Sequence, residues 1–174
     1  NPAVIQAHKV VNSGEIGEII SVEAQMNCHH KAEKRQWLSS FPGGMMFFLG
    51  CHLVDLVIGF MGMPKEIIPL NSCSGVEGVT ADDQGFAIMK YDSGNSFVKT
   101  YATERFGFLR RQLVISGTRG TVEINPLEIY GVRTPHNNHN TRIRISSERG
   151  GNDINSWHDT GEWKTIGLFD GYDA

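Results

Sequence analysis

The sequence predicts an α+β domain, in which helices pack on one face of a large and mostly antiparallel sheet. Two helical segments come first, with one strand between them, and beyond residues 62–64 the apolar residues mostly recur at every second position. Short turns separate these later strands, and sequential strands joined by short turns pair antiparallel. The 174 residues are enough for one domain with its own core.

The chain opens with a helix signal that is followed by a strand signal. Asn1-Pro2 is typical of a helix start, because Asn caps the free N–H groups and Pro is tolerated at the first helical position. Apolar residues follow at helical spacing as far as Val11, and Gly14 allows the chain to turn. Alternation of apolar and polar residues then predicts a strand over residues 19–27.

Residues 44–60 are predicted to form one buried helix. Apolar side chains cover almost its whole circumference, which is typical of a helix that protein encloses on most sides. His52 and Asp55 interrupt it and share one face, with Phe48 one turn earlier on that face. This face either forms internal hydrogen bonds or lines a pocket. Two glycines flank the face, where another backbone or a ligand has room to approach: Gly44 and Gly59.

The later strands are predicted from their alternation and from the turns between them. Residues 92–95 form a hairpin signal, and residues 117–120 are a second short connection. Residues 31–40 are polar except for Trp37 and Leu38, and residues 136–140 and 147–156 are expected to be loops. The predicted strands span residues 66–74, 84–91, 95–103, 111–116, 121–124, 128–133, 142–147 and 163–166.

Composition and charge exclude several classes of protein. The chain is 40% hydrophobic and 20% charged, which is ordinary for a soluble domain. Its net charge of −3 gives no reason to expect nucleic acid or an anionic membrane as partner. The basic pairs Lys34-Arg35 and Arg110-Arg111 are interpreted as solvated surface. A membrane helix is not expected over residues 45–63, because His52 and Asp55 lie near its centre.

The cysteines and the chain ends indicate an intracellular segment of a longer protein. Three cysteines without close pairing argue against a disulfide framework, and no Asn-x-Ser/Thr acceptor occurs. We therefore expect a cytoplasmic protein. The chain lacks a starting Met and a signal peptide, and its last residues look like a helix that has only begun. These features suggest that it was cut from something longer.

Several motifs resemble the C-terminal domain of the Gfo/Idh/MocA oxidoreductases, the family of glucose–fructose oxidoreductase and inositol dehydrogenase. Residues 14–19, Gly-Glu-Ile-Gly-Glu-Ile ahead of a strand, resemble the start of that domain. Residues 43–55 match the family pattern Gly-Gly-…-Asp-x-Gly-x-His-x-x-Asp, except that Phe48 stands at the first Asp. Residues 115–120, Ile-Ser-Gly-Thr-Arg-Gly, resemble a turn of its sheet, and residues 171–174 resemble the start of its last helix.

The resemblance implies an NAD(P)-dependent oxidoreductase that acts on a sugar, polyol or related compound. In this interpretation residues 1–174 are the substrate-binding and dimerisation domain, and a separate N-terminal Rossmann domain binds NAD or NADP. The sequence has neither the Gly-x-Gly-x-x-Gly fingerprint nor the family's Glu-Lys-Pro segment. We therefore expect no bound cofactor and no turnover from this segment alone, and a homo-oligomer formed through the open sheet.

The candidate catalytic residue is His52. Histidine ordinarily titrates at about pH 6.5, so an imidazole can accept a carbinol proton as hydride leaves for a nicotinamide. The alternative is a core histidine that hydrogen-bonds a backbone carbonyl. Asp55, placed on the substrate side of the helix, is expected to be a buried and paired structural group more than a catalyst. Phe48 can neither orient the imidazole nor bond a hydroxyl, which indicates a more apolar substrate part or a different reaction.

Three further positions are candidates for the pocket wall. His30 follows the first strand and is assigned a contact to a substrate hydroxyl, and Trp37 either stacks on a sugar ring or covers the helix. Cys28 and His29 lie beside His30, but adjacent strand residues point to opposite faces and no second pair has ligand spacing, so no metal is predicted. Residues 157–158, Trp-His, are assigned to a loop that borders the pocket.

Two other functions remain open on the sequence. One is a glycoside hydrolase or elimination enzyme of the same family that uses NAD transiently. Phe48 in place of Asp is compatible with this alternative. The other is a non-catalytic sensor or scaffold subunit whose sheet forms a dimer.

Overall fold

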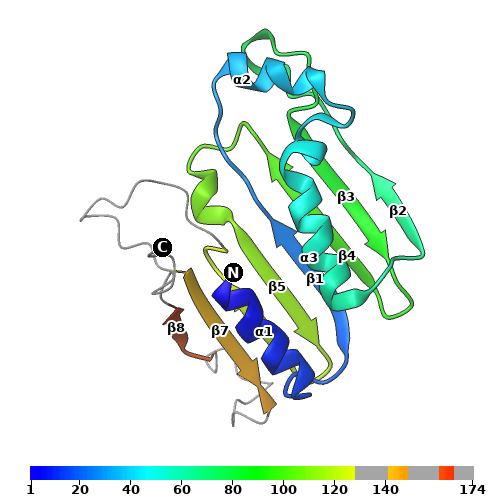
Figure 1. The fold of residues 1–174 in the computed structure, drawn as a ribbon, viewed down its shortest axis with the longest axis vertical. Helices are drawn as coiled ribbons and strands as arrows, with labels where there is room; N and C mark the ends of the chain where they lie inside the picture. Colours follow the sequence, from blue (N-terminus) through cyan, green and yellow to red (C-terminus); the bar gives the residue numbers. More distant parts are fainter. Residues whose placement is uncertain (128–140, 149–160, 167–174) are drawn as a thin grey trace, which may run out of the picture.

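The computed structural model describes residues 1–127, 141–148 and 161–166 (Figure 1). Within these ranges one eight-stranded sheet has the order β2-β3-β4-β1-β5-β6-β7-β8. Every pairing is antiparallel except that of β1 with β4, so the predicted α+β class with a mostly antiparallel sheet is confirmed. The strands are β1 Ile19–Gln25, β2 Glu66–Pro69, β3 Gln84–Lys90, β4 Asn95–Tyr101, β5 Gln112–Gly117, β6 Gly120–Ile124, β7 Thr141–Ser147 and β8 Trp163–Ile166.

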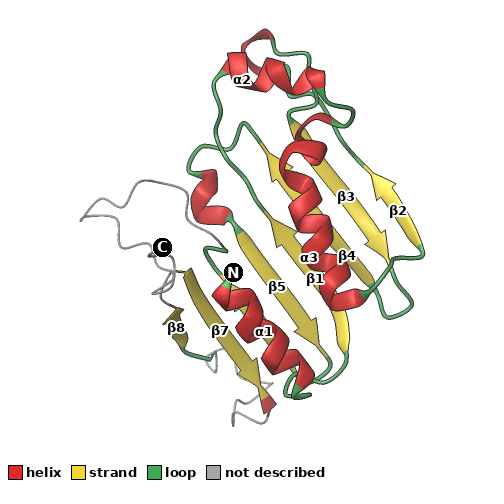
Figure 2. Cartoon of the chain, in the orientation of Figure 1, coloured by secondary structure: helices red, strands yellow, loops and turns green. Residues whose placement is uncertain are grey.

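Helices α1 (Pro2–Asn12) and α3 (Cys51–Met61) lie side by side on one face of this sheet, as Figure 2 shows. The ring of His8 on α1 stacks on Phe60 of α3 with centroids 4.0 Å apart, which joins the two helices directly. The short helix α2 (Ala32–Trp37) lies at the end of the sheet where β1 finishes. None of the described helices is both long and apolar enough to cross a membrane.

Helix α1 begins where the sequence predicts. The Asn1 side chain accepts a hydrogen bond of 2.9 Å from the backbone N–H of Ala3, and Pro2 occupies the first turn. Asn1 also donates to the carbonyl of Leu127 at 2.5 Å, so the start of the helix is tied to the residue that follows the β6 region. The buried side of the helix, which includes Ala3, packs against β6 and β7.

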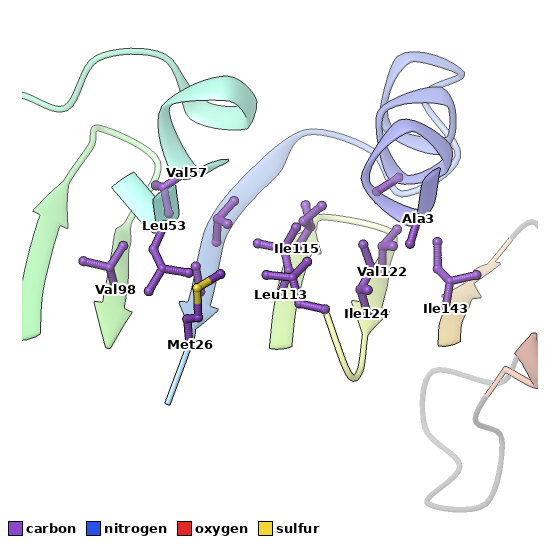
Figure 3. Packing of buried hydrophobic residues seen from close by; sticks show 14 of the residues in the cluster. Ala3, Met26, Leu53, Val57, Val98, Leu113, Ile115, Val122, Ile124 and Ile143 are labelled. Carbon is purple, nitrogen blue, oxygen red and sulfur yellow. The ribbon is translucent and has the colours of Figure 1, made fainter. Parts of the chain in front are cut away.

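The core lies between the two helices and the sheet (Figure 3). Leu53 and Val57 of α3 point toward Met26 and Val98, whereas Ala3 of α1 faces the strands that carry Val122, Ile124 and Ile143. A second, smaller cluster lies under α2. Its buried members are Cys28, Leu38, Met45, Val79, Ala81 and Ala102.

The central helix differs from its prediction in shape and in burial. A π-helical turn, Met46–Gly50, leads into α3, and only the side with Leu53 and Val57 is fully buried. The interpretation that protein encloses most of the helix is wrong for this chain, because His52 and Asp55 are exposed. An apolar circumference indicates the capacity to be buried on all sides, but here only the sheet side of the helix is covered.

Some predicted elements are shorter or longer than expected. The strand predicted over residues 66–74 ends at Pro69, although a bridge between Ser72 and Gln84 continues the pairing beyond it. Helix α2 forms within the polar segment 31–40, where no helix was predicted. The strand predicted over residues 128–133, the loop 136–140, most of the loop 147–156 and the helix start at 171–174 lie outside the described residues.

Two of the motifs that resemble the oxidoreductase family contact each other. The turn at residues 14–18 lies against the hairpin between β5 and β6, where the N–H of Arg119 donates to the carbonyl of Ile16 at 2.9 Å. A Cβ at Gly117 would lie 2.2 Å from that same carbonyl oxygen, so only glycine fits there. The two motifs therefore form one packed unit, although about a hundred residues separate them.

Gly44 and Gly59 provide a matched pair of stability predictions. Gly44 has φ +49°, and an added Cβ would lie 2.2 Å from the carbonyl oxygen of Asp82, whereas a Cβ at Gly59 meets nothing within 4 Å. We expect Gly44→Ala to lower the free energy of unfolding by roughly 1–3 kcal/mol or more through backbone strain and the clash. Gly59→Ala should be neutral or raise it by up to about 1 kcal/mol.

Urea-induced unfolding of the two variants beside the unchanged protein measures this difference. Equal midpoints for the two alanine variants would contradict the close approach at Gly44.

Candidate functional site

A pocket of about 320 Å³ opens between α1 and α3, above the end of β1. Its wall is partly apolar and carries two titratable side chains, His52 and Asp55, which come from the same face of α3. The lining residues are Asn1, Val4, Met26, Leu49, His52, Asp55, Leu56 and Leu127. Two of the three residues that the sequence marks on this face of the central helix, His52 and Asp55, therefore line a pocket, whereas Phe48 does not.

His52 and Asp55 are both free to meet a ligand. Neither side chain makes a hydrogen bond or ion pair with any other described residue, and both are exposed. The expectation that Asp55 is buried and paired is wrong, because α3 turns this residue away from the sheet. The alternative of a core histidine at position 52 fails for the same reason. An imidazole and a carboxylate beside apolar surface can together accept hydrogen bonds and a proton from a hydroxyl group.

Phe48 and Trp37 belong to an aromatic cluster at the start of the central helix. The Trp37 and Phe48 rings meet edge to face with centroids 5.7 Å apart, and Trp37 meets Phe41 in the same way at 4.7 Å. Phe41 in turn stacks on Phe47 at 5.4 Å. Trp37 covers the helix and still keeps 48% of its surface exposed, so both interpretations of this residue are compatible with its position.

His30 is half-buried where the chain leaves β1. The backbone N–H of His30 donates to the carbonyl of Ala102 at 2.8 Å. Burial lowers the pKa of His30 to about 4, with smaller contributions from the positive charges of Lys34, Arg111 and His29. Its imidazole is therefore neutral near pH 7 and can donate one hydrogen bond and accept another.

Cys28, two residues earlier, is held as a neutral thiol. Burial raises its pKa to about 11, against the opposing influence of Arg111 and Lys34. Within the described ranges no three His, Cys, Asp or Glu side chains gather as a set of metal ligands.

Arg35 is the residue of this region that sequence reasoning missed. It is 2% exposed and forms an ion pair of 2.9 Å with Asp83, which is itself fully buried. Its guanidinium also donates to the carbonyls of His30 at 3.0 Å and Val76 at 3.1 Å, and it pairs with Glu77. The interpretation of both basic pairs as solvated surface is thus wrong for Arg35 and for Arg111, which are both buried.

No local signal distinguishes Arg35 from its neighbour Lys34, because both of its carboxylate partners, Asp83 and Glu77, lie more than 40 positions away in the chain. An isolated arginine in a polar segment is ordinarily solvated. Only the fold brings Asp83 beneath it.

The five predicted site residues form two adjoining groups. His52 and Asp55 line the pocket, whereas Phe48 and Trp37 contact each other at the start of the helix, and His30 lies where the chain leaves β1. Leu49 connects the groups, because it lines the pocket and also packs against the cluster under α2. Trp157, His158, His136 and His139 lie outside the described residues.

Comparison with known proteins gives a family and a fold. The family model described as the GFO/IDH/MocA C-terminal domain matches residues 4–123. None of the curated proteins compared with the chain matches it.

Among solved structures, levoglucosan dehydrogenase in complex with NADH and levoglucosan has a TM-score of 0.70 at 15% identity, covering 95% of this chain and 44% of that chain. An aldose–aldose oxidoreductase from Caulobacter crescentus, complexed with glycerol, has a TM-score of 0.65 at 16% identity over 94% of this chain and 44% of that one. The WlbA dehydrogenase from Bordetella pertussis, in complex with NADH and UDP-GlcNAcA, has a TM-score of 0.61 at 18% identity, covering 71% and 40%.

At such identities these likenesses concern the fold. The chain spans less than half the length of each of these three structures.

Proposed function

The chain belongs to the GFO/IDH/MocA C-terminal domain family, and on that premise we propose that it is the substrate-binding and oligomerisation domain of an NAD(P)-dependent oxidoreductase. The substrate is a sugar, polyol or related carbinol or carbonyl compound. The observation that carries this proposal is the pocket between α1 and α3, in which His52 and Asp55 have no hydrogen-bond or ion-pair partner among the residues that the structure describes. The relatives solved with NADH, levoglucosan or UDP-GlcNAcA support the same class of chemistry.

The pocket fits one half of such a reaction. His52 accepts the proton of the carbinol hydroxyl, and Asp55 is close enough along the helix to hold a neighbouring hydroxyl group. Leu49, Leu56 and Met26 supply an apolar wall for the carbon face of a ring. A nicotinamide, when bound, supplies the acceptor for the hydride.

The dinucleotide itself is assigned to another part of the full-length protein. The sequence has no Gly-x-Gly-x-x-Gly loop in which backbone N–H groups would hold a pyrophosphate. The length of the solved relatives, of which this chain covers less than half, supports a second domain in that role.

The oligomerisation role rests on the sheet face that points away from α1 and α3. Side chains alternate along a strand, so the neighbours of buried Ala87 and Val98 lie on this second face. Phe86 and Phe97 stack there with centroids 5.6 Å apart. Half-buried aromatic rings on a broad sheet are suited to packing against a second copy.

A redox-neutral reaction is the second candidate, and Phe48 favours it. Position 48 lies one turn before His52, where the family pattern has an Asp that could work with the imidazole. Phe48 lacks the carboxylate of that pattern, which is compatible with a hydrolase or elimination enzyme that uses NAD only transiently.

The test is the fate of NAD in the full-length protein. Incubation with NAD or NADP and a panel of sugars and polyols should produce the reduced cofactor, read at its absorbance band, in step with oxidised product. Product formed without net reduced cofactor would favour the redox-neutral candidate. If no substrate gives product or reduced cofactor, the oxidoreductase and the redox-neutral enzyme are both contradicted. The non-catalytic scaffold is then the candidate that remains.

A further inference from the structure

The pocket between α1 and α3 changes in polarity from its rim to its inner end. His52 and Asp55 lie at the rim, because both residues are exposed. Met26 and Leu127 close the inner end, since both line the pocket and keep only 4% and 2% of their surface exposed. The half-buried residues that line the pocket between rim and inner end are all apolar: Val4, Leu49 and Leu56.

The backbone polar groups at the inner end are already paired. The N–H of Met26 donates to a carbonyl of β4 at 2.9 Å, and the carbonyl of Met26 accepts from the hydroxyl of Thr100 at 2.9 Å. The N–H of Leu127 donates to the carbonyl of Arg111 at 2.6 Å, and the carbonyl of Leu127 accepts from the side-chain amide of Asn1 at 2.5 Å. The inner end therefore presents hydrocarbon and paired backbone to a ligand.

The third polar side chain of the pocket, Asn1, is engaged at both of its polar atoms. Its oxygen accepts the backbone N–H that begins α1, and its nitrogen donates to Leu127. None of the buried side-chain polar atoms that lack a hydrogen bond within the described ranges belongs to a residue that lines the pocket. A ligand hydroxyl pushed to the inner end would thus lose its water and gain no described partner, which is unfavourable.

We propose that the substrate is a deoxy sugar, whose methyl group enters the apolar inner end of the pocket while its hydroxyl groups stay at the rim with His52 and Asp55. This inference rests on the proposed function and names a substrate class for it. A 6-deoxyhexose has the required arrangement, because its methyl group and two vicinal hydroxyls stand on consecutive ring carbons. The cavity volume of about 320 Å³ is at the small end of ligand pockets, roughly 300–1,000 Å³, which suits a single ring.

The experiment compares sugars that differ by one hydroxyl. Dissociation constants are measured by calorimetry for the full-length protein, with the reduced cofactor present so that a carbinol binds without being oxidised. The pairs are L-fucose with L-galactose, L-rhamnose with L-mannose, and 6-deoxyglucose with glucose. The preference is the dissociation constant of the hydroxylated sugar divided by that of its deoxy partner.

Two variants bring a polar group into the pocket, and a third is their control. Met26→Gln places an amide at the inner end on a side chain of similar length. Val4→Thr adds a hydroxyl to the wall at a half-buried position with little change of volume, so it keeps the test available if Met26→Gln does not fold. Met63→Gln makes the same exchange as Met26→Gln at a residue that is 77% exposed and does not line the pocket.

The unchanged protein should bind at least one deoxy sugar about ten- to hundredfold more tightly than its hydroxylated partner, the range expected for one such group in an apolar pocket. Met26→Gln should lower this preference by about tenfold, because the amide offers the hydroxyl a partner. Val4→Thr should lower it severalfold, and Met63→Gln should preserve it. A lower preference in either folded pocket variant supports the proposal.

Equal affinities within all three pairs, or tighter binding of the hydroxylated sugars, would overturn the deoxy-sugar assignment. An unchanged preference in every folded pocket variant would overturn it as well. These outcomes leave the proposed function intact if reduced cofactor still forms with hydroxylated sugars. Conversely, selective binding of a deoxy sugar without reduction of NAD or NADP would support the assignment of the pocket and contradict the oxidoreductase.

Discussion

Replacing Arg35 with Met is expected to lower the free energy of unfolding by about 3–5 kcal/mol, the usual cost of removing one partner from a buried ion pair. The reason is that Asp83, which has no exposed surface, would keep its charge without its guanidinium partner. Among the described residues, Asp83 would retain the hydrogen bonds of Ser74, which donates from its backbone N–H at 2.8 Å and from its hydroxyl at 2.7 Å. The carbonyls of His30 and Val76 would lose their donor as well.

Urea-induced unfolding of this variant is compared with that of a variant in which an exposed ion pair is broken. Lys65→Met breaks an ion pair in which both side chains are well exposed, at 67% and 81%, and should cost less than about 1 kcal/mol. The double variant Arg35→Met with Asp83→Leu should recover part of the loss, because the uncompensated charge is then gone. If Arg35→Met costs no more than Lys65→Met, the ion pair does not contribute to the stability of the fold.

The same ion pair determines where part of the candidate site lies. Helix α2 has six residues, and a helix this short is not stable by itself. Arg35 connects this helix to the segment with Asp83 through an ion pair, and to the backbone carbonyl of His30 through a hydrogen bond. Trp37 projects from the same helix, so its position depends on Arg35.

The sequence predicts most elements of this fold because their signals are local. The Asn1-Pro2 start, the alternation in β3 and β4 and the glycine turn between β5 and β6 each need only a few neighbouring residues to be recognised. The signal for the face with His52 and Asp55 is also local, because helical spacing alone puts the two side chains together.

The features that the sequence does not predict depend on residues far apart in the chain. The parallel pairing of β1 with β4, which register Glu23 with Phe97, has no local signature. The burial of Arg35 depends on Asp83, and α2 depends on Arg35. The exposure of α3 depends on what covers its outer side, which its own apolar residues do not specify.

Replacing His52 with Asn in the full-length protein is expected to lower kcat by roughly 10²–10⁴-fold, the usual contribution of a general base. Asparagine keeps a hydrogen-bonding side chain in the pocket, but its amide cannot take a proton near neutral pH. Binding of the nicotinamide cofactor should change little, because the cofactor is assigned to a different domain.

His8→Asn is the matched control for this experiment. His8 lies on α1 and stacks on Phe60, and it does not line the pocket, so the same exchange there should leave kcat within about twofold of the unchanged protein. Asp55→Asn tests the rival carboxylate on the same face. Unchanged turnover in His52→Asn together with a large loss in Asp55→Asn would transfer the role of base to Asp55.

The unfolding midpoint and KM add a distinction that the rate alone lacks. A purely structural role of His52 would lower kcat through disorder of α3 and would shift KM and the unfolding midpoint as well. A general base removed from an exposed position should leave the unfolding midpoint nearly unchanged, because His52 makes no hydrogen bond within the described part of the chain. Loss of turnover with an unchanged unfolding midpoint is therefore the combination that identifies His52 as the proton acceptor.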